Sequence, residues 1–458
     1  MSKIYTRRDF LRYASTISAG AALAACAPLA TPTEGNMADD PAPAANEKKF
    51  AGTTLTYWSM NYGDIIEWED MLNGFAAKFK EETGIEVTVD IINWSVAFNT
   101  WLTVANGGTH PDCADMYWLH SFAAIGAGIY GPMPITKYQY LYFPDLKERF
   151  FEPSLRDVFH NGEFYGVPWR GDIRPMIVRT DFFEEAGIDK APDTWDEIVE
   201  VAKKLTVVDP NGQTSRYGFT FGSALPIQQL MQYYWSAGGA FMTADGKTAT
   251  IDNEEMRKTL QWAYDLIWTH KVTPPEFMEK SYVPLDAFRT GTVAMIGSVS
   301  DSVGNDLERD NPELNEKWGY ALPPTGPAKR AAYAGAGYWG VLHGTDKVEQ
   351  SVQWIGFMAR RENMQTVSEY IGRVSPDKIV MQSPYWSEKP WRIVVAETLN
   401  YGHPSQQPSP AWAALAGTEP GGVIFDLFYD ALVKRDDMEA TIKRAQQRMQ
   451  EEMDKTQL

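Results

Sequence analysis

The sequence predicts an α/β protein built from two domains, and three observations support that prediction. The chain has 458 residues, and single hydrophobic cores stop growing near ~250–300 residues, so about two cores are expected. Residues 53–91 follow a strand, helix, strand pattern, which is typical of a largely parallel sheet with a right-handed crossover. A similar pattern begins again after Pro168, which indicates a second unit of the same class.

The first unit shows its helix most clearly. Between an apolar strand at 53–57 and an alternating strand at 85–91, apolar residues recur at steps of three and four over residues 64–83. This stripe consists of Ile65, Trp68, Leu72, Phe75 and Phe79. Gly84 is the expected stop. A second helix containing Trp101 ends at Gly107–Gly108, and Pro111-Asp112 introduces the next strand.

The second unit and the remainder of the chain are expected to alternate helices and strands. In order, we expect a strand at 176–178, a short helix opened by a capping-box variant at Asp181–Glu184, a helix opened by Thr194–Glu197, a helix containing Leu230 and Trp235, a helix at 254–268, a strand at 292–296, a strand at 338–342, a helix at about 347–370 and a last amphipathic helix from about Asp437.

Composition and motif spacing exclude several classes of function. Acidic residues outnumber basic ones 60 to 42, and no basic run follows the N-terminus, so nucleic acid is not an expected partner. No two of the six histidines stand three or four apart on a predicted helix, so we expect no metal site. Glycine-rich stretches at 126–131 and 335–340 lack the following helix that a dinucleotide site needs, so no cofactor is expected.

The N-terminus reads as an export signal with a lipid-attachment site. Residues 6–12 carry the pair Arg7-Arg8 and resemble a twin-arginine signal, with Arg12 where Lys is more usual. Residues 23–26 resemble the lipobox of bacterial lipoproteins, which implies that Cys26 is diacylated. We therefore predict a signal peptide at 1–25 and a flexible linker at 26–50. The other cysteine, Cys113, is expected to be a buried, inert thiol.

Five separated segments resemble the family 1 extracellular solute-binding proteins that serve ABC importers, a family that includes maltose-binding protein. They are Gly107–Asp112, Tyr165–Thr206, Ser236–Lys247, Phe288–Ser298 and Trp354–Met358. The resemblance implies a two-lobe periplasmic-binding-protein fold (type II), with lobes joined by a hinge of chain crossings. Mapped onto this chain, the first lobe comprises 51–169 and 336–374, the second 170–335 and 375–450, and a polar tail 451–458. The crossings fall near Trp169, Gly335–Gly337 and Arg373–Ser375.

The same resemblance implies a function and a location. The protein is expected to be a monomer, anchored outside the cytoplasm through Cys26 (in the periplasm or on the cell surface), that passes a small solute to the membrane permease subunits of an ABC transporter. It is not expected to be an enzyme. Ligand would lie between the lobes, at the carboxyl ends of the strands.

A carbohydrate, in particular an oligosaccharide, is the ligand that the residue inventory favours. Sixteen Trp and 22 Tyr are many for this length, and aromatic planes stack on the C–H faces of sugar rings. Strand-end position and the family resemblance nominate twelve ligand-binding residues: Trp58, Asn61, Trp118, His120, Trp169, Asp172, Trp235, Ser298, Asp301, Tyr338, Trp339 and Trp412.

Three alternatives stay open at this point. A polyamine would need several carboxylates, which Asp172 and Asp301 permit. A glycerol phosphate would need guanidinium groups, which Arg170 and Arg174 permit. A cell-surface glycoside hydrolase would need a catalytic carboxylate pair, which the 60 acidic residues allow.

Overall fold

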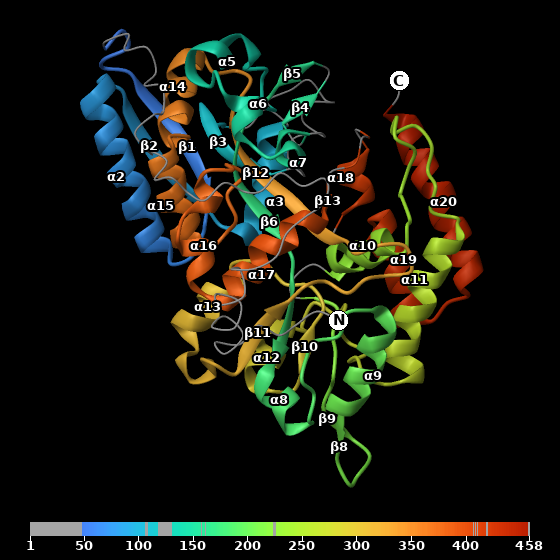
Figure 1. Cartoon of the computed structure of the whole chain (residues 1–458). Helices are drawn as coiled ribbons and strands as arrows, with labels where there is room; N and C mark the ends of the chain where they lie inside the picture. Colours follow the sequence, from blue (N-terminus) through green and yellow to red (C-terminus); the bar gives the residue numbers. More distant parts are fainter. Residues whose placement is uncertain are drawn as a thin grey trace, which may run out of the picture.

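The computed structural model describes residues 48–105, 109–117, 131–156, 158–160, 162–222, 226–405, 407, 409, 411–417 and 420–456. The predicted signal peptide, Cys26, Trp118 and His120 lie outside these residues. In Figure 1 the blue N-terminal elements gather around one sheet at the upper left, and the green and yellow elements form a second body below and to the right.

The larger sheet mixes parallel and antiparallel strands. Its order is β13 (Gly402–Pro404), β12 (Ala332–Val341), β3 (Cys113–Tyr117), β1 (Thr54–Met60) and β2 (Glu86–Ile92), and β6 (Val167–Ile173) also pairs with β12. Strand β1 runs parallel to β2 and β3, as the β-α-β pattern predicts. Strand β12 runs antiparallel to β3 and β6. Because β1, β2 and β3 are parallel, their carboxyl ends meet at one edge, called here the first-lobe edge.

Helix α2 (Ile65–Thr83) confirms the range that the apolar stripe predicts. The Asp64 carboxylate caps its first turn by accepting from Ile66 N and Glu67 N, and Gly84 ends it at φ 75°. Trp68, Leu72, Phe75 and Phe79 are buried. Ile65 is 45% exposed, so its assignment to the stripe is wrong: it is the first helical residue and lies beyond the edge of the core.

The single helix expected at 347–370 is two helices, α14 (Val348–Met358) and α15 (Arg361–Ile371). The break lies at Arg360, whose φ of −59° and ψ of 140° are not helical and whose guanidinium pairs with Glu82. The Asn363 side chain donates to the Phe357 carbonyl, which satisfies a C-terminal carbonyl of α14. No Gly or Pro marks this break, so helical periodicity alone runs through it.

The remaining elements of the first lobe are short. They are α3 (Trp94–Ala105), α5 (Thr136–Tyr142), α6 (Leu146–Arg149), α7 (Glu152–Arg156), β4 (Phe159–His160) and β5 (Glu163–Phe164). Cys113 is fully buried on β3, and burial raises the pKa of its thiol, as expected for an inert cysteine.

The smaller sheet has the order β10 (Met295–Ile296), β7 (Met176–Arg179) and β11 (Trp318–Ala321), with both neighbours antiparallel to β7. Around it lie α8 (Thr180–Glu185), α9 (Trp195–Leu205), β8 (Val207–Val208), β9 (Thr214–Arg216), α10 (Pro226–Ser236), α11 (Glu254–Tyr264), α12 (Pro284–Thr290), α13 (Val303–Asp310), α16 (Tyr385–Glu388), α17 (Pro390–Thr398), α18 (Trp412–Leu415), α19 (Val423–Tyr429) and α20 (Met438–Lys455).

Three helices of this second body show whether the predicted capping motifs open them. Thr194 caps α9 by accepting from Glu197 N, as the motif predicts, whereas the Glu197 carboxylate accepts from Asp193 N, one residue before the N–H that a capping box uses. The capping box at Asp181 is wrong, because α8 begins at Thr180 and the Asp181 carboxylate instead forks with the Arg179 guanidinium at 2.7 and 2.9 Å. Helix α20 starts after its Asp437 cap as expected, but it continues into the range assigned to a polar tail and buries Met453.

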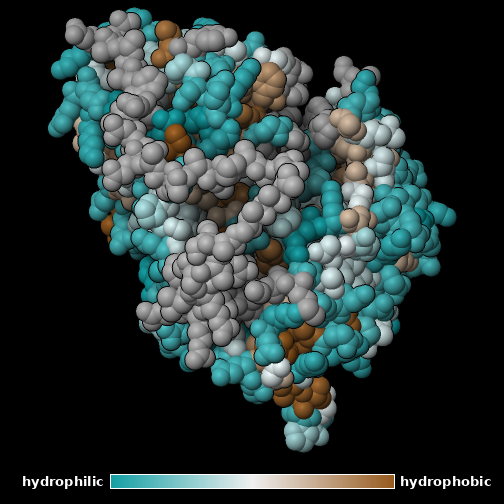
Figure 2. All heavy atoms as spheres, viewed as in Figure 1, coloured by the Kyte–Doolittle hydropathy of each residue, from teal (hydrophilic) through white to brown (hydrophobic). Residues whose placement is uncertain are grey.

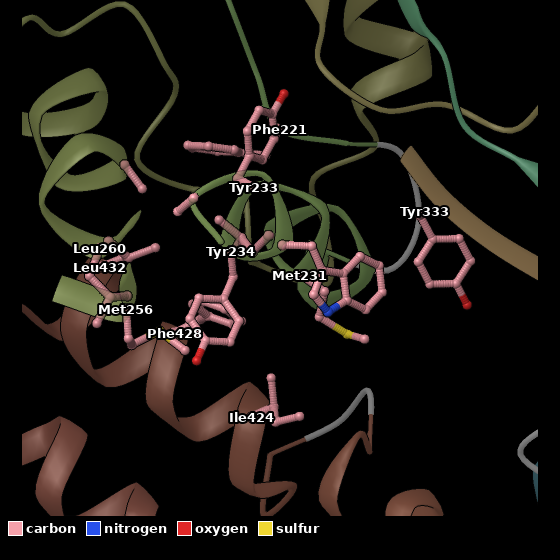
Figure 3. Packing of buried hydrophobic residues seen from close by; sticks show 14 of the residues in the cluster. Phe221, Met231, Tyr233, Tyr234, Met256, Leu260, Tyr333, Ile424, Phe428 and Leu432 are labelled. Atoms are coloured by element: carbon pink, nitrogen blue, oxygen red, sulfur yellow. The ribbon is translucent and has the colours of Figure 1, made fainter. Parts of the chain in front are cut away.

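The cores follow the two bodies. One cluster takes its residues from 55–169 and 338–380, and two others take theirs from 173–333 and 374–453. Figure 3 shows part of the largest cluster, around α10: Tyr234 lies near Met256 and Leu260 of α11 and Phe428 of α19, Tyr233 lies beside Phe221, and Tyr333 stands to the side on β12.

The surface is mostly hydrophilic in Figure 2, with apolar side chains gathered at the lower tip where Figure 1 places the β8–β9 hairpin. Val207 and Val208 of this hairpin are 39% and 57% exposed. Among the described residues, no helix has the length and apolar character that a membrane span requires.

Candidate functional site

Three chain segments run side by side between the two bodies. Strand β6 lies antiparallel to β12, with an irregularity in the pairing between Gly337 and Tyr338. The third segment joins them where Gly171 N donates to the Val374 carbonyl at 2.7 Å. The predicted crossings at Trp169, Gly335–Gly337 and Arg373–Ser375 therefore form one narrow bundle.

Trp169, on β6, lies inside a stack of three indoles. One face packs on Trp339, with ring centroids 5.3 Å apart and planes 8° apart, and the Trp68 ring lies 6.3 Å away at 18°. Its Nε1 donates to the Asp115 carboxylate at 2.9 Å, and only 3% of the residue is exposed. In this structure both faces of Trp169 are covered by protein. Tyr338 and Trp339, next in line on β12, are each 1% exposed.

A hydrogen-bonded chain leads from this stack to the first-lobe edge. Tyr62 OH donates to Asp115 Oδ2 at 2.8 Å and accepts from Arg170 Nε at 2.6 Å. Burial raises the pKa of the Asp115 carboxyl, and the Arg170 charge opposes that rise. Burial likewise raises the pKa of Tyr62, so its phenol stays protonated. The Arg170 guanidinium is thus anchored at Nε, while its two terminal nitrogens have no hydrogen-bond partner among the described residues.

The Arg170 side chain occupies space that is open because the residue opposite it on the neighbouring strand is a glycine. It lies opposite Gly337 of β12, and a Cβ at that glycine would come within 2.7 Å of Arg170 Nε and 2.9 Å of its Cζ. A side chain at position 337 would therefore displace the guanidinium.

The first-lobe edge carries Asn61 after β1 and Trp94 after β2. Trp94 Nε1 donates to the Asn61 carbonyl at 2.7 Å, and its ring meets Tyr62 edge-on at 5.7 Å. The Arg170 guanidinium lies over the Trp94 ring, 5.6 Å from its centroid. Asn61 Oδ1 is buried without a donor among the described residues. Trp58 lies on β1, three residues before Asn61. It is partly exposed, donates to Asp90 at 3.1 Å and packs against Trp101.

Charged groups at the crossings are paired with one another. Arg174 forks onto Asp172 at 3.1 and 3.2 Å. Arg373 reaches both Asp172, at 3.4 Å, and Asp301, at 3.1 Å. Asp301 also accepts from Val374 N at 2.9 Å. These two carboxylates already have cationic partners within the protein.

Their acidities differ because their surroundings differ. Burial disfavours the charged form of Asp172, but Arg174 and Arg373 outweigh it and hold the pKa of Asp172 well below its usual value. Burial dominates at Asp301, which is completely enclosed, and raises its pKa to about 6 despite Arg373.

The residues predicted on the second lobe lie in its interior. Trp235 stacks on His403 at 4.2 Å and on Tyr333 at 6.2 Å, and it has no exposed surface. Ser298 is also fully buried and bonds Gln232 at 3.3 Å. Trp412 is fully buried, and its Nε1 donates to the Ser405 carbonyl at 2.9 Å.

The structure thus brings Asn61, Trp169, Asp172 and Asp301 to the crossings and the adjoining edge, while Trp118 and His120 lie outside the described residues. Sequence reasoning missed Trp94 and Tyr62. The signal for Trp94 was available: the strand-end rule that selects Trp58 and Trp118 after the first and third strands applies equally to Asn93-Trp94 after the second.

A cavity of about 260 Å³ lies elsewhere, in the second lobe. It is lined by Thr214, Ser215, Tyr217, Pro274, Glu276, Tyr282, Thr292 and Val293. No crossing segment contributes to it, so it is separate from the site above. Among the described residues, no group of three or more His, Cys, Asp or Glu side chains could hold a metal ion.

Two mixed α/β bodies joined by adjacent crossings, with polar and aromatic groups at the carboxyl edge of a parallel sheet, define a two-lobe binding protein. The chain belongs to the bacterial extracellular solute-binding protein family, whose model matches residues 66–365. This confirms the predicted family and fold class, and it makes the chain a member of an extracytoplasmic family that binds solutes for ABC transporters.

Named relatives agree with that membership. A binding protein of Brucella abortus is 28% identical over 283 residues, which cover 60% of this chain and 63% of the relative. An arabinooligosaccharide-binding protein of Halalkalibacterium halodurans is 25% identical over 222 residues, covering 48% of this chain and 47% of the relative. The matches therefore span about half to two thirds of these relatives.

Solved structures share the fold over most of the chain. A solute-binding protein of Thermotoga lettingae, bound to α-D-tagatose, superposes with a TM-score of 0.73 at 22% identity, covering 88% of this chain and all of the other. The maltose-bound MalE3 of T. maritima gives 0.72 at 23% identity, covering 87% of this chain and 99% of the other.

Proposed function

We propose that this chain is a lipid-anchored, extracytoplasmic binding protein that captures a carbohydrate, in particular an oligosaccharide, between its lobes and delivers it to ABC permease subunits. The first-lobe edge is the observation that carries the proposal. The exposed indole of Trp94 stands beside the crossings together with an acceptor on Asn61 and donors on Arg170 that have no hydrogen-bond partner among the described residues. Aromatic faces with convergent polar groups suit a sugar ring.

The pairing of charged residues at the crossings favours a neutral sugar over a polyamine or a glycerol phosphate as the ligand. A polyamine needs free carboxylates, but Asp172 and Asp301 are taken up by Arg174 and Arg373. A glycerol phosphate would draw on Arg170 and Arg174 together, but Arg174 forks onto Asp172, which leaves only the terminal nitrogens of Arg170 to meet a phosphate. Adding an unpaired charge to this buried, balanced cluster would be costly.

Relatives point in the same direction. The arabinooligosaccharide-binding protein and the structures bound to tagatose and maltose are binding proteins for neutral carbohydrates by name. A glycoside hydrolase gains no support from Asp301, because that carboxylate is enclosed and committed to Val374 N and Arg373. We therefore propose a binding role without catalysis, which an assay for reducing sugar released from oligosaccharides would check.

A thermal-shift panel tests the ligand class. Maltose, maltotriose, an arabinan trisaccharide, tagatose and ribitol are compared with spermidine and glycerol 3-phosphate. Binding to the folded state raises stability by RT ln(1 + [L]/Kd), so a true ligand at 100 times Kd adds about 2.7 kcal/mol. We expect a neutral carbohydrate to raise the melting temperature; a response confined to spermidine or glycerol phosphate would overturn the carbohydrate assignment.

Membrane attachment is a separate part of the proposal, which rests on the sequence motifs around Arg7-Arg8 and Cys26. Two acyl chains give stable attachment, so Cys26→Ala should release the exported protein into the soluble fraction. Replacing Arg7 and Arg8 by Lys should keep the precursor in the cytoplasm. A native protein that fractionates as soluble with an unmodified N-terminus would contradict the lipid anchor.

A further inference from the structure

Trp94 is the one tryptophan among the described residues that is substantially open to solvent. It is 41% exposed, whereas most of the other described indoles are buried and the rest are only partly exposed. An exposed indole of this size gives up its contact with water when a ligand covers it, which favours binding. Its position after β2, at the first-lobe edge, places it beside the crossings.

The indole is also held in a fixed orientation. Its Nε1 bond to the Asn61 carbonyl, the Tyr62 ring against its edge and the Arg170 guanidinium over its face leave little freedom to lose on binding. A side chain ordered before the ligand arrives pays less entropy when the ligand binds.

Hydrogen-bonding groups of both kinds surround this ring. Arg170 uses Nε on Tyr62 and has two terminal nitrogens without a partner among the described residues. Asn61 Oδ1 is an acceptor without a donor there. Asn61 Oδ1 is a buried acceptor, and leaving it unpaired costs free energy that a ligand hydroxyl donating to it restores.

We propose that Trp94, Arg170 and Asn61 form the sugar-stacking subsite of the first lobe. A sugar ring lies against the open part of the Trp94 indole, one of its oxygens accepts from an Arg170 terminal nitrogen, and one hydroxyl donates to Asn61 Oδ1. This inference rests on the proposed carbohydrate-binding function and adds to it the residues that fix the ring. Because Arg170 stands on β6, the contact also joins ligand to a crossing strand.

Trp268 offers a matched control on the second lobe. Its Nε1 donates to the Leu432 carbonyl at 2.8 Å and Arg435 lies 4.9 Å from its ring, so it makes the same two kinds of contact as Trp94. It packs in the core around α11 and η5 (Asp430–Lys434), away from the crossings.

The experiment is titration calorimetry of the full chain with the panel sugar that gives the largest thermal shift. Trp94→Ala should weaken binding roughly 10- to 100-fold, which corresponds to covering about 50–100 Å² of apolar surface. Trp94→Phe should keep most of the affinity, and Trp268→Ala should stay within about twofold of wild type. Arg170→Lys, which keeps the charge but loses the fork, should weaken binding by about tenfold or more.

The outcomes separate this inference from the function it rests on. If a sugar binds the wild type and folded Trp94→Ala binds it within threefold, the subsite is overturned while the binding function stands. If no neutral carbohydrate binds the wild type, the proposed function fails and the subsite fails with it. Melting curves without ligand show that each variant is folded at the temperature of the titration.

Discussion

Two tryptophan groups of the first lobe touch the same side chain, Tyr62, and differ in almost everything else. Trp68 and Trp169 contact one part of the Tyr62 ring, at 5.3 and 5.4 Å, and are 1% and 3% exposed. Trp94 contacts it at 5.7 Å and is 41% exposed. The indole stack packs the interior beside the crossings, whereas Trp94 stands at the edge near polar groups of Asn61 and Arg170 that have no partner in the described part of the chain. Neither the residue type nor a position near a crossing shows by itself whether an indole is buried in the core or is open to a ligand.

The largest expected effect is a loss of folding stability when the buried indole of Trp169 is removed. Trp169→Ala removes the middle ring of the stack and leaves the Asp115 carboxylate without one donor. Large-to-small changes of this kind cost about 3–5 kcal/mol, so urea unfolding should show a loss of that size. Trp169→Phe should lose less, because it fills part of the space.

The same variant also shows whether Trp169 contacts the ligand. If Trp169 only packs the hinge, its folded Ala variant should bind sugar within about threefold of wild type. A 30-fold or larger loss of affinity, measured where the variant is folded, would make Trp169 a ligand residue, as its place at the crossing predicts from sequence.

Two glycines on β12 test whether Arg170 belongs to the ligand site, with a smaller effect on stability. Gly337→Ala would place a Cβ 2.7 Å from Arg170 Nε, so we expect a stability loss of about 1–3 kcal/mol and weaker sugar binding. Gly335→Ala, two residues earlier on the same strand, meets nothing closer than 3.4 Å and should change both quantities little. Equal affinity in the two variants would remove Arg170 from the ligand site.

The smallest effect concerns the enclosed charge at Asp301. Burial raises its pKa from 3.8 to about 6, so ionising it in the folded protein costs free energy. Its contribution to stability is therefore complete below about pH 4 and is lost as the pH rises through 6. Asn at this position does not ionise, so Asp301→Asn should flatten the fall in unfolding free energy between pH 4 and 6.5.

Asp310 provides the control for that pH profile. It is a surface carboxylate paired with Arg309, so Asp310→Asn should leave the slope over this range as it is in wild type. Identical slopes in wild type and Asp301→Asn would show that Asp301 does not ionise in this window.

Sequence reasoning reached the fold because periodicity and helix caps are local. The α2 stripe with its Gly84 stop, the helix start at Thr194 and the β-α-β pattern of β1 and β2 all follow from residues close together in the chain. It failed where a distant partner decides the outcome. Glu82 holds Arg360 at the break between α14 and α15, and Arg179 engages Asp181 in place of a cap.

The candidate site was only partly readable for the same reason. Strand ends locate the first-lobe edge, and that rule finds Asn61 and, applied consistently, Trp94. It does not show which indoles are covered, because burial of Trp169 depends on Trp68 and Trp339, which are about 100 and 170 residues away in the chain. The pairing of Asp172 and Asp301 by Arg373 likewise needs three segments to meet.

The central claim, that the chain binds a neutral carbohydrate between two lobes joined by β6, β12 and Arg373–Ser375, is tested most directly by solution scattering. A ligand that touches both lobes favours the closed arrangement and shifts the population toward it. The radius of gyration should therefore decrease when the best panel sugar saturates the protein. An unchanged radius with the sugar demonstrably bound would contradict the claim.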